Sequence, residues 1–440
     1  MRKALVKGSE LEDVAIASPL DVLPEAPAVE PRKSESNVGL RRTFAAFRHH
    51  NYRLFFLGQL VSVIGTWMQT VAIGWLVYDL SNSALVLGLI LFLGGVPVTL
   101  FTLWGGALAD RIDKRRVVIT TELAAMFLAL VLAALVYFDL IQIWHVALIV
   151  FLDGITNAFD IPTRQSFVVE MVGKEDLTNA IALNSSLFNG ARVFGPALAG
   201  MLIGVIGIAG CFFLNSLSYL AVVSAYLAMR MPRAPEPRPL KPMWHETVEA
   251  LQYVWSHRIL RAVMILVAIV SLFGWPYSVL LPVFARDILH ANVGQYGFLV
   301  AANGVGALLG ALALASLGDS PHKRRLVYWS LVGFCVMLGL FALSKVYWIS
   351  AAVLGGAGFF MILFFATANS VVQMRVPDEL RGRVMGIYSL AFLGLTPFGS
   401  LLAGALARST SAAFTVLLGS GICVAAGLAA MWIMRAGRKA

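Results

Sequence analysis

Two charged side chains, Asp153 and Arg192, lie near the middle of long apolar runs in this sequence. If the run 143–162 is a helix that crosses a membrane, Asp153 lies about 15 Å deep, because each helical residue rises ~1.5 Å. Arg192 lies at a similar depth in the run 180–206. A charge at that depth must face a partner or a water-filled cavity. Two interpretations follow: a fixed ion pair that holds two helices together, or a site that binds protons or substrate.

Other polar residues also occur inside the apolar runs. Asp160 lies closer to the end of its run and four residues before Arg164, so we expect it to pair with Arg164 or to cap local backbone. Four amides are candidates for lining a substrate cavity, although amides inside a membrane more often join helices by hydrogen bonds. These amides are Gln69, Asn157, Asn303 and Asn369.

The sequence lacks the residue patterns of an enzyme or of a metal site. Its seven histidines fall in loops or at the ends of apolar runs, without metal-ligand spacing, and its three cysteines lie inside apolar runs without paired spacing. No Gly-x-x-x-x-Gly-Lys-Ser/Thr loop is present to bind ATP. We therefore expect no catalytic residues, no metal and no cofactor, and an ion or substrate gradient must drive any pumping.

The composition predicts an integral membrane protein. Hydrophobic residues make up 59% of the 440, and the mean hydropathy is +0.80. A spanning helix needs about 20 apolar residues, so the chain has room for about a dozen. The net charge of +10 could indicate nucleic-acid binding. Basic residues also crowd the cytoplasmic loops of membrane proteins, and we expect lipid rather than nucleic acid as the partner.

Twelve spans are predicted, and the basic residues set their orientation. Of the 34 Lys and Arg residues, 30 lie on one side of these spans, three on the other, and Arg192 lies within a span. The side rich in Lys and Arg faces the cytoplasm, so both termini are expected there. The predicted spans are 54–78, 84–109, 117–138, 143–162, 180–206, 209–229, 262–284, 294–317, 326–343, 347–371, 384–406 and 412–434.

The chain divides into two halves of six spans, and the halves repeat. The segment 110–117 is echoed at 319–326, 170–177 at 373–380, and 194–200 at 398–404. Two similar six-span halves are typical of secondary transporters. The predicted divisions are a disordered cytoplasmic tail (1–40), a first half that starts with a basic amphipathic segment (41–229), a cytoplasmic linker with a surface helix (230–261), a second half (262–434) and a short cytoplasmic tail (435–440).

The segment 105–116, between the second and third predicted spans, carries six charges in twelve residues. Its Gly-x-x-x-Asp-Arg-x-x-Lys-Arg-Arg spacing resembles the loop signature of the major facilitator superfamily, with Asp113 where the usual pattern has Gly. The resemblance implies an all-α fold of twelve transmembrane helices in two pseudo-repeat halves. It also implies that this loop is a conformational switch formed by Gly106, Asp110, Arg111, Lys114, Arg115 and Arg116.

Further segments resemble the transmembrane-secretion branch of that superfamily, to which the enterobactin exporters belong. These segments are 51–56, 159–164, 191–196 and 377–383. The fifth predicted span also resembles the helix motif of facilitator antiporters, at Gly190, Gly195, Pro196 and Gly200. Its glycines and proline either permit close helix packing or help to close the pore against leak.

Asp110 has a predicted partner in the other half. It lies at the end of the second span, where the helix dipole disfavours a carboxylate. The eleventh span is expected to begin near Gly382, where free backbone N–H groups flanked by Arg381 and Arg383 would form an anion site. We expect Asp110 to bridge the halves only when the inner gate is closed, and so to stabilise the outward-facing state.

The resemblance implies a secondary active transporter in the bacterial inner membrane that exports a small organic molecule, drug-like or siderophore-like, by alternating access and proton antiport. It does not identify the molecule. An uncoupled facilitator or lipid flippase is an alternative within transport. A non-transporting membrane sensor or subunit is an alternative of another class. We expect the transporter to work as a monomer with protons and a small molecule as its partners.

Overall fold

The computed structural model describes residues 44–436 except 110–112, 174, 231–242 and 318–322. Every regular element in this part of the chain is helical. The described residues belong to one compact unit, Phe44–Ala440. The tail 1–40, most of the proline-rich part of the linker and the last four residues lie outside the described residues.

The first half contains six membrane-crossing helices, of which the last two form the element α6 and are joined at Gly207. The helix α6 crosses twice because Gly207, at φ 72° and ψ 176°, reverses the chain in a conformation that glycine adopts readily. The elements are η1 (Ala45–Arg48), α2 (His50–Ser81), α3 (Ala84–Ala109), α4 (Lys114–Tyr137), α5 (Ile143–Val172) and α6 (Leu177–Ala228).

The helix α7 (Met243–Ser256) lies in the predicted linker, before the second half. Six crossings follow, two of which are interrupted by tighter or wider helical turns near prolines. The elements are α8 (Arg258–Ile269), η2 (Val270–Gly274), η3 (Trp275–Leu280), α9 (Leu281–Val283), η4 (Phe284–Ile288), α10 (Val293–Ser316), α11 (Lys323–Leu343), α12 (Tyr347–Gln373), α13 (Asp378–Ser389), η5 (Leu390–Gly394), α14 (Thr396–Ser409) and α15 (Ala412–Ala436).

Among the described residues, eleven helical segments are long and apolar enough to cross a membrane, and counting α6 twice gives twelve crossings. The prediction of twelve spans is therefore confirmed. Several helices extend beyond the ends of the predicted spans. The helix α5 contains Pro162, the last residue of its predicted span, and continues for ten more residues to Val172. Large apolar side chains such as Trp104, Val205 and Trp432 are exposed, as expected for helices that face lipid.

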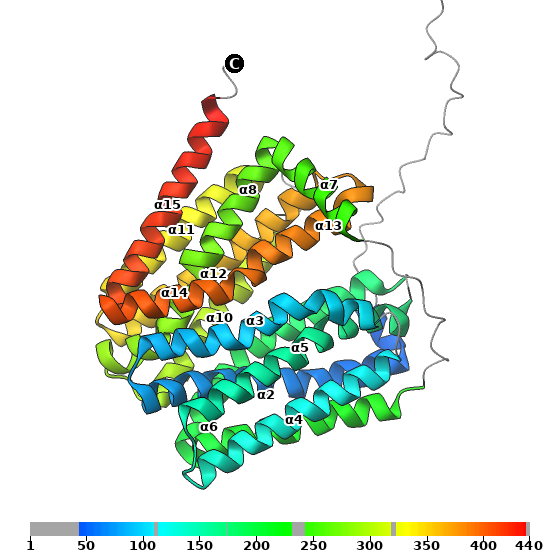
Figure 1. The fold of residues 1–440 in the computed structure, drawn as a ribbon, viewed down its shortest axis with the longest axis vertical. Coiled ribbons are helices and arrows are strands. Elements are labelled where there is room, and N and C mark those ends of the chain that lie inside the picture. Colours follow the sequence, from blue (N-terminus) through cyan, green and yellow to red (C-terminus); the bar gives the residue numbers. More distant parts are fainter. Residues whose placement is uncertain (1–43, 110–112, 174, 231–242, 318–322, 437–440) are drawn as a thin grey trace, which may run out of the picture. The chain divides into compact units, whose positions relative to one another are not determined.

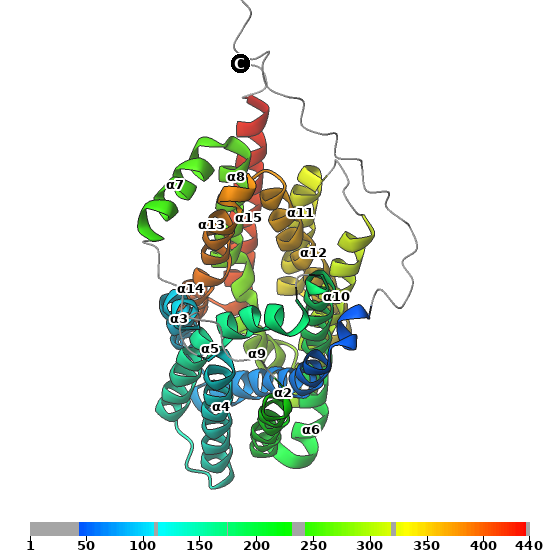
Figure 2. The same ribbon diagram turned by 90° about the vertical axis from the view of Figure 1, so that its right-hand side faces the viewer.

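The helices of the two halves form separate groups. In Figure 2, α2 to α6 lie together, while α8, α11, α12, α13 and α15 lie together on the other side. We call the end with the loops at 82–83 and 410–411 the distal end, and the end where α2 begins and α15 ends the proximal end. Figure 1 shows α8 and α15 inclined away from α2 and α5 toward the proximal end.

Toward the distal end, the halves meet through small residues. The helix α3 packs on α14, and α6 packs on α10. A Cβ added to Gly88 would lie 2.5 Å from the carbonyl of Ser400, and one added to Gly200 would lie 2.5 Å from the carbonyl of Gly294. Glycine is thus needed for this close backbone approach, and the contact closes the distal end between these helices.

Candidate functional site

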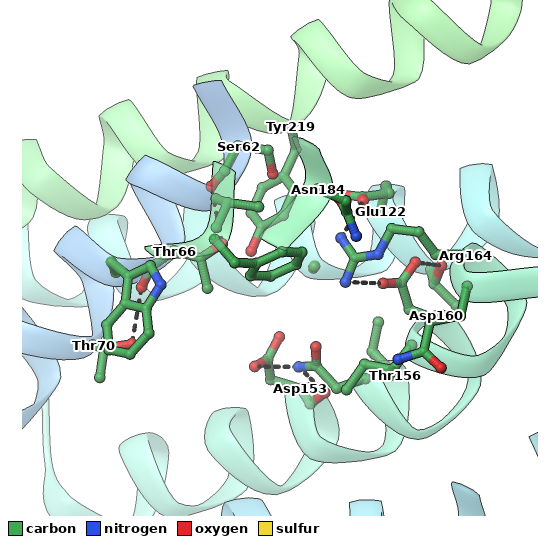
Figure 3. A pocket seen from close by; sticks show the side chains of 18 of the residues that line it. Ser62, Thr66, Thr70, Glu122, Asp153, Thr156, Asp160, Arg164, Asn184 and Tyr219 are labelled. Carbon is green, nitrogen blue, oxygen red and sulfur yellow. Dashed lines mark hydrogen bonds and ion pairs between the residues drawn. The ribbon is translucent and has the colours of Figure 1, made fainter. Parts of the chain in front are cut away.

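A cavity of about 620 Å³ lies inside the first half (Figure 3). Its walls come from α2, α4, α5 and both crossings of α6, so one half alone forms it. Apolar wall is supplied by Trp67, Ala125 and Phe188 among others. The polar side chains that line it include Ser62, Thr66, Thr70, Glu122, Asp153, Thr156, Asn157, Asp160, Arg164, Gln165, Asn184 and Tyr219.

Arg164 lies at the centre of a buried charged cluster on one wall. It pairs with Asp160, one helical turn earlier, at 2.9 Å, as predicted from the spacing of the two residues. It also lies 4.0 Å from Glu122 of α4 and donates a hydrogen bond of 2.6 Å to Gln59 of α2. Gln59 in turn donates to Glu122 at 3.4 Å. The three helices α2, α4 and α5 of the first half are thereby joined.

The cavity carries more negative than positive groups. Among the residues that line it, Glu122, Asp153 and Asp160 supply three carboxylates, and Arg164 supplies one guanidinium. Ionised carboxylates without counter-charges are costly away from water. The excess of two carboxylates can be balanced by protons or by a positively charged group of a ligand. This arrangement can therefore bind and release protons as the cavity changes its exposure to water.

Asp153 does not form the ion pair with Arg192 that one interpretation of the sequence required. Its carboxylate accepts a hydrogen bond of 3.0 Å from Asn157, and among the described residues no basic side chain lies within ion-pair distance of it. Asn157 also donates to the backbone carbonyl of Asp153 at 2.9 Å. The amide thus fixes the carboxylate without neutralising it.

Arg192 lies instead at the junction of the two halves. Its Nη2 donates to Oδ1 of Asn303 on α10 at 3.1 Å. The guanidinium carbon lies 5.8 Å from the ring centre of Trp67 on α2 and 5.8 Å from that of Trp275 on η3. A guanidinium over an indole face is a favourable cation–π arrangement. Of the two interpretations drawn from the sequence, the fixed ion pair between Asp153 and Arg192 is therefore absent from this structure.

Of the four amides predicted for the cavity, Asn157 lines it. Gln69 accepts a hydrogen bond of 2.8 Å from Asn215 and so joins the two helices α2 and α6. Asn303 bonds across the halves to Arg192, and Asn369 accepts a bond of 2.5 Å from Gln373 on the same helix. The helix-joining role that is common for membrane amides accounts for Gln69 and Asn303.

The predicted antiporter motif lies in the first crossing of α6. A Cβ on Gly195 would meet the Cβ of Trp67 at 2.5 Å, so Gly195 permits close packing on α2. Gly200 permits the contact with α10 described above, and Pro196 is buried inside the helix. Gly190 has open space where its Cβ would be. Close packing thus accounts for two of the three glycines.

The predicted switch loop is described in part. Gly106 lies in α3, while Asp110 and Arg111 lie outside the described residues. The three basic residues of the loop that the structure describes have partners within the first half. Lys114 bonds to Glu170 at 2.5 Å, Arg115 donates to the carbonyl of Leu227 at 2.8 Å, and Arg116 lies 3.6 Å from Asp113.

The predicted inter-half partners lie on α13, and one detail of the prediction is wrong. The helix begins at Asp378, so Gly382 lies inside it, where its backbone N–H is used in the helix rather than left free. Arg381 pairs with Asp378 at 2.5 Å, and Arg383 pairs with Glu249 of α7 at 3.1 Å. Both arginines are therefore engaged within the second half and the linker helix.

Near the proximal end, the chain before α2 is attached to the turn between α5 and α6. Asp176 accepts hydrogen bonds of 2.7 Å from both His49 and Arg48, and the backbone N–H of Ala46 donates to Asn179 at 2.9 Å. The bond from His49, aided by Arg48, lowers the pKa of the Asp176 carboxyl. The segment predicted to lie on the membrane surface is thus fastened to the first half.

Sequence reasoning missed Glu122 and Gln59. Glu122 is the one charged residue in the predicted span 117–138, and that isolation was a usable signal. Gln59 carries no such signal, since a single amide in an apolar helix is common. Their convergence on Arg164 depends on the packing of three helices, which the sequence pattern alone does not give.

Comparisons with known proteins agree with this architecture. A family model described as transmembrane secretion effector matches residues 41–438. The chain is 26% identical over 360 residues to the staphyloferrin A transporter of Staphylococcus aureus, which spans 80% of this chain and 88% of that protein. It is 25% identical over 391 residues to the multidrug efflux pump Tap of Mycolicibacterium fortuitum (87% and 95%). It is 25% identical over 395 residues to the enterobactin exporter EntS of Citrobacter koseri (88% and 92%).

Solved structures with the same fold are also transporters. The nucleoside transporter NupG superposes with a TM-score of 0.68 at 13% identity, over 88% of this chain and 99% of that one. A bacterial homologue of the lysosomal transporter Spinster, solved in an inward-facing and unoccupied conformation, gives 0.65 at 14% identity, over 89% and 95%. The family match extends over nearly the whole chain. The protein therefore belongs to the transmembrane secretion effector family of the major facilitator superfamily and is a multi-pass membrane transporter rather than an enzyme.

Proposed function

We propose that this protein exports a small organic molecule, siderophore-like or drug-like, in exchange for protons, by alternating access across a bacterial inner membrane. The observation that carries the proposal is the cavity of the first half, where three carboxylates face one guanidinium. The relatives support the direction and the class of substrate, because they are named as an enterobactin exporter, a multidrug efflux pump and a staphyloferrin A transporter.

The contacts between the halves support alternating access. Gly88, Gly95, Gly200 and Gly404 allow close packing toward the distal end. Transport of a molecule held between the halves requires that this end opens while the proximal end closes. In the conformation described, the distal contacts favour a cavity that opens proximally, to the side we assign to the cytoplasm. The switch loop 106–116 and Arg381 are the groups we assign to closing the proximal end.

The orientation follows from the distribution of basic residues. In the topology predicted from the sequence, 30 of the 34 Lys and Arg residues fall on one side of the spans, and by the positive-inside rule we assign that side to the cytoplasm. Reporter fusions after Pro235 and after Ala440 should both report cytoplasm, and a fusion at Ser81 should report the outside. An outside signal from position 235 would exclude this orientation.

We assign the coupling proton to Asp153. Neutralising Asp160 or Glu122 would remove an anionic partner from Arg164, and a buried charge that loses its partner is costly. Asp153 has an amide as its partner, so it can gain and lose a proton without leaving a cation unpaired. Asp153 also lines the cavity, so water and substrate can reach it from the open side.

Transport in proteoliposomes tests the proposal. The purified protein is reconstituted and offered enterobactin and, separately, the drug-like dye ethidium, with and without an imposed pH gradient. Accumulation against the concentration gradient of at least one compound, lost when the pH gradient is collapsed, is the expected result. Equal movement with and without the gradient would indicate an uncoupled facilitator or flippase. Absence of counterflow for all tested compounds, in protein that is folded, would favour a sensor or a subunit.

A further inference from the structure

Arg192 lacks an anionic partner among the described residues, although it lies within a membrane-spanning helix. No carboxylate of the described residues lies within ion-pair distance of its guanidinium. Its hydrogen-bond partner is the neutral carbonyl oxygen of Asn303, at 3.1 Å. Burying a guanidinium without a counter-ion opposes folding. The presence of Arg192 is therefore explained more simply by a role in function than by a contribution to stability.

The amide of Asn303 is held so that it offers this oxygen. Its Nδ2 donates to the hydroxyl of Tyr277 at 2.7 Å and to the carbonyl of Leu354 at 3.1 Å, so both amide hydrogens are used. The carbonyl oxygen is left for Arg192, and Asn303 is almost fully buried. The guanidinium is thus oriented by a rigid neutral group rather than neutralised.

The remaining donors of the guanidinium are open to a ligand. The Arg192 side chain is partly exposed. Its nitrogens are not among the buried polar atoms that lack a hydrogen-bond partner in the described part of the chain. Trp67 and Trp275 flank the guanidinium at 5.8 Å each, one from each half. Trp67 also lines the cavity, so a molecule in the cavity borders this group.

Arg192 lies next to Trp67, a residue of the cavity wall, at the place where α6 meets α10. Its own backbone carbonyl lies against Gly304 of α10, where an added Cβ would meet it at 2.6 Å. Further toward the distal end, α6 and α10 remain in backbone contact at Gly200 and Gly297. A ligand that enters from the proximal end therefore meets a guanidinium between two indoles before the closed contact.

We infer that Arg192, Asn303, Trp67 and Trp275 form a binding site for an anionic group, a carboxylate or a similar oxyanion, carried by the transported molecule. A guanidinium presents paired N–H donors that match a carboxylate, and the flat indole faces suit a planar group attached to it. Two of the four residues belong to each half, so the anion binds where the halves separate during alternating access.

The charge of the cavity adds one constraint, which rests on the proposed proton exchange. A negative group on Arg192 and an ionised Asp153 repel each other, so a purely anionic molecule would be carried together with protons. If the molecule is exchanged for protons, it must compete with the proton for the carboxylate of Asp153. The transported molecule should therefore carry a positive or hydrogen-bond-donating group toward Asp153 in addition to its anionic group.

Binding of benzoate and benzamide to the full-length protein in neutral lipid nanodiscs tests the site. The two probes share size and shape and differ in charge. We expect benzoate to bind more tightly, and Arg192→Gln to weaken benzoate about 10- to 100-fold, the range for a charge-assisted hydrogen bond, while benzamide stays unchanged. The exposed Arg408, at the end of α14, supplies the control Arg408→Gln, which should bind both probes as the wild type does.

A second variant keeps the arginine and adds the missing counter-ion. Asn303→Asp places a carboxylate beside the guanidinium. This carboxylate should form an ion pair with Arg192 and so abolish benzoate binding. Thermal unfolding provides a readout of a different kind: Arg192→Gln should leave the melting temperature unchanged or raise it, because an unpaired buried charge is removed. A purely structural Arg192 would give a lower melting temperature instead.

Nanodiscs that contain phosphatidylglycerol distinguish a lipid phosphate from a soluble carboxylate as the source of the anion. If the lipid occupies the site, it should displace benzoate from the wild type, and Arg192→Gln should remove that competition. Equal binding of benzoate and benzamide, or wild-type benzoate affinity in both Arg192→Gln and Asn303→Asp, would overturn the inference. Because binding is measured without a pH gradient, a failure of proton coupling in proteoliposomes would leave this result intact.

Discussion

Arg286 and Asp79 join the two halves at the distal end, where Arg286 Nη1 donates to Asp79 Oδ1 at 3.1 Å. The same guanidinium lies over the ring of Tyr78, at 5.8 Å from its centre. The Tyr78 hydroxyl in turn donates to the carboxylate of Asp287. Two consecutive residues of each half thus make crossed contacts, Tyr78 and Asp79 with Arg286 and Asp287. We call these four residues the distal latch.

Weakening the distal latch should open the distal end more often. The Arg286–Asp79 pair is well exposed, and exposed pairs contribute at most about 1 kcal/mol, so Asp79→Asn should shift the equilibrium no more than about fivefold. A cysteine at Thr70, which lines the cavity, should become more reactive toward an impermeant maleimide added outside. Arg408→Gln provides the matched control. Unchanged labelling in the double variant Tyr78→Phe with Asp79→Asn would exclude the latch as a gate.

The glycine contact between α6 and α10 should also be required for distal closure. At Gly200 a side chain would collide with the backbone of Gly294, whereas at Gly204, one turn later, an added Cβ meets nothing within 4 Å. Gly200→Val should therefore destabilise the closed distal end by about 1–3 kcal/mol, as overpacking does. Gly204→Val should be nearly neutral. The ratio of outside labelling at Thr70→Cys in the two variants measures the difference, and equal labelling would contradict it.

Attachment of the segment before α2 should depend on pH through Asp176. The contacts with His49 and Arg48 lower the pKa of this carboxyl in the folded protein. Its contribution to stability is therefore complete above the unfolded pKa of about 3.9 and is lost as the pH falls through the lower folded value. The protection of the Ala46 N–H, which bonds to Asn179, is its exchange rate relative to the intrinsic rate at the same pH; this protection should be smaller at pH 3 than at pH 7.

Asp176→Asn should reduce the protection of Ala46 already at pH 7, so that exchange there is faster than in the wild type, because the amide cannot form an ion pair with Arg48. Asp139→Asn, in a turn near the distal end, is the control and should exchange at Ala46 as the wild type does. Slow exchange at pH 7 in Asp176→Asn would show that the aromatic packing of Phe47 on Tyr52 and Phe56 is sufficient to hold the segment.

Local spacing predicted the parts of the site that lie on one helix. Asp160 and Arg164 are one turn apart, so their pairing could be expected from the sequence. The approach of Glu122 to Arg164, and of Asn303 to Arg192, joins residues 42 and 111 positions apart. Such contacts depend on how the helices rotate and pack, and apolar helices with similar hydropathy on every side carry little information about rotation.

Helix ends were predicted less well than helix cores for a related reason. The predicted spans stop where apolar residues stop, but backbone hydrogen bonding continues past that point. The helix α5 runs through Pro162 to Val172, and α13 begins at Asp378, well before the apolar run 384–406. The anion site expected at Gly382 failed because four residues of helix precede it.

The switch loop gives a prediction that rests on its sequence pattern. Asp110 is expected to pair with a basic group of the other half, such as Arg381, when the proximal end closes. In the conformation described, Arg381 is bound to Asp378. Loss of about 1.4 kcal/mol from the proximally closed state shifts the equilibrium about tenfold. Asp110→Ala should therefore express normally, transport slowly and increase the labelling of Thr156→Cys from the proximal side.

Arg381→Gln should reproduce the effect of Asp110→Ala, and the double variant should be no worse than either single one, because both remove the same contact. Arg383→Gln is the matched control, since Arg383 pairs with Glu249 of the linker helix. Wild-type labelling and transport in Asp110→Ala would leave the loop as a topology signal alone.

Amide substitutions should distinguish Asp153 from Glu122 as the carrier of the coupling proton. Asp153→Asn keeps the hydrogen-bonding shape of the side chain and leaves Arg164 paired with Asp160 at 2.9 Å, so the protein should fold and exchange substrate. Accumulation driven by a pH gradient should be lost, because an amide cannot bind the transported proton. Glu122→Gln also leaves that pair intact, and it should retain accumulation if Asp153 carries the proton.

Arg164→Gln sets the scale for structural damage in the same experiment. It leaves Glu122 and Asp160 buried without their shared cation, which should destabilise the protein by about 3–5 kcal/mol and reduce its folded yield. A variant with normal folded yield that exchanges substrate but does not accumulate it in response to a pH gradient then has a coupling defect. Normal accumulation in Asp153→Asn together with its loss in Glu122→Gln would show that Glu122, rather than Asp153, carries the coupling proton.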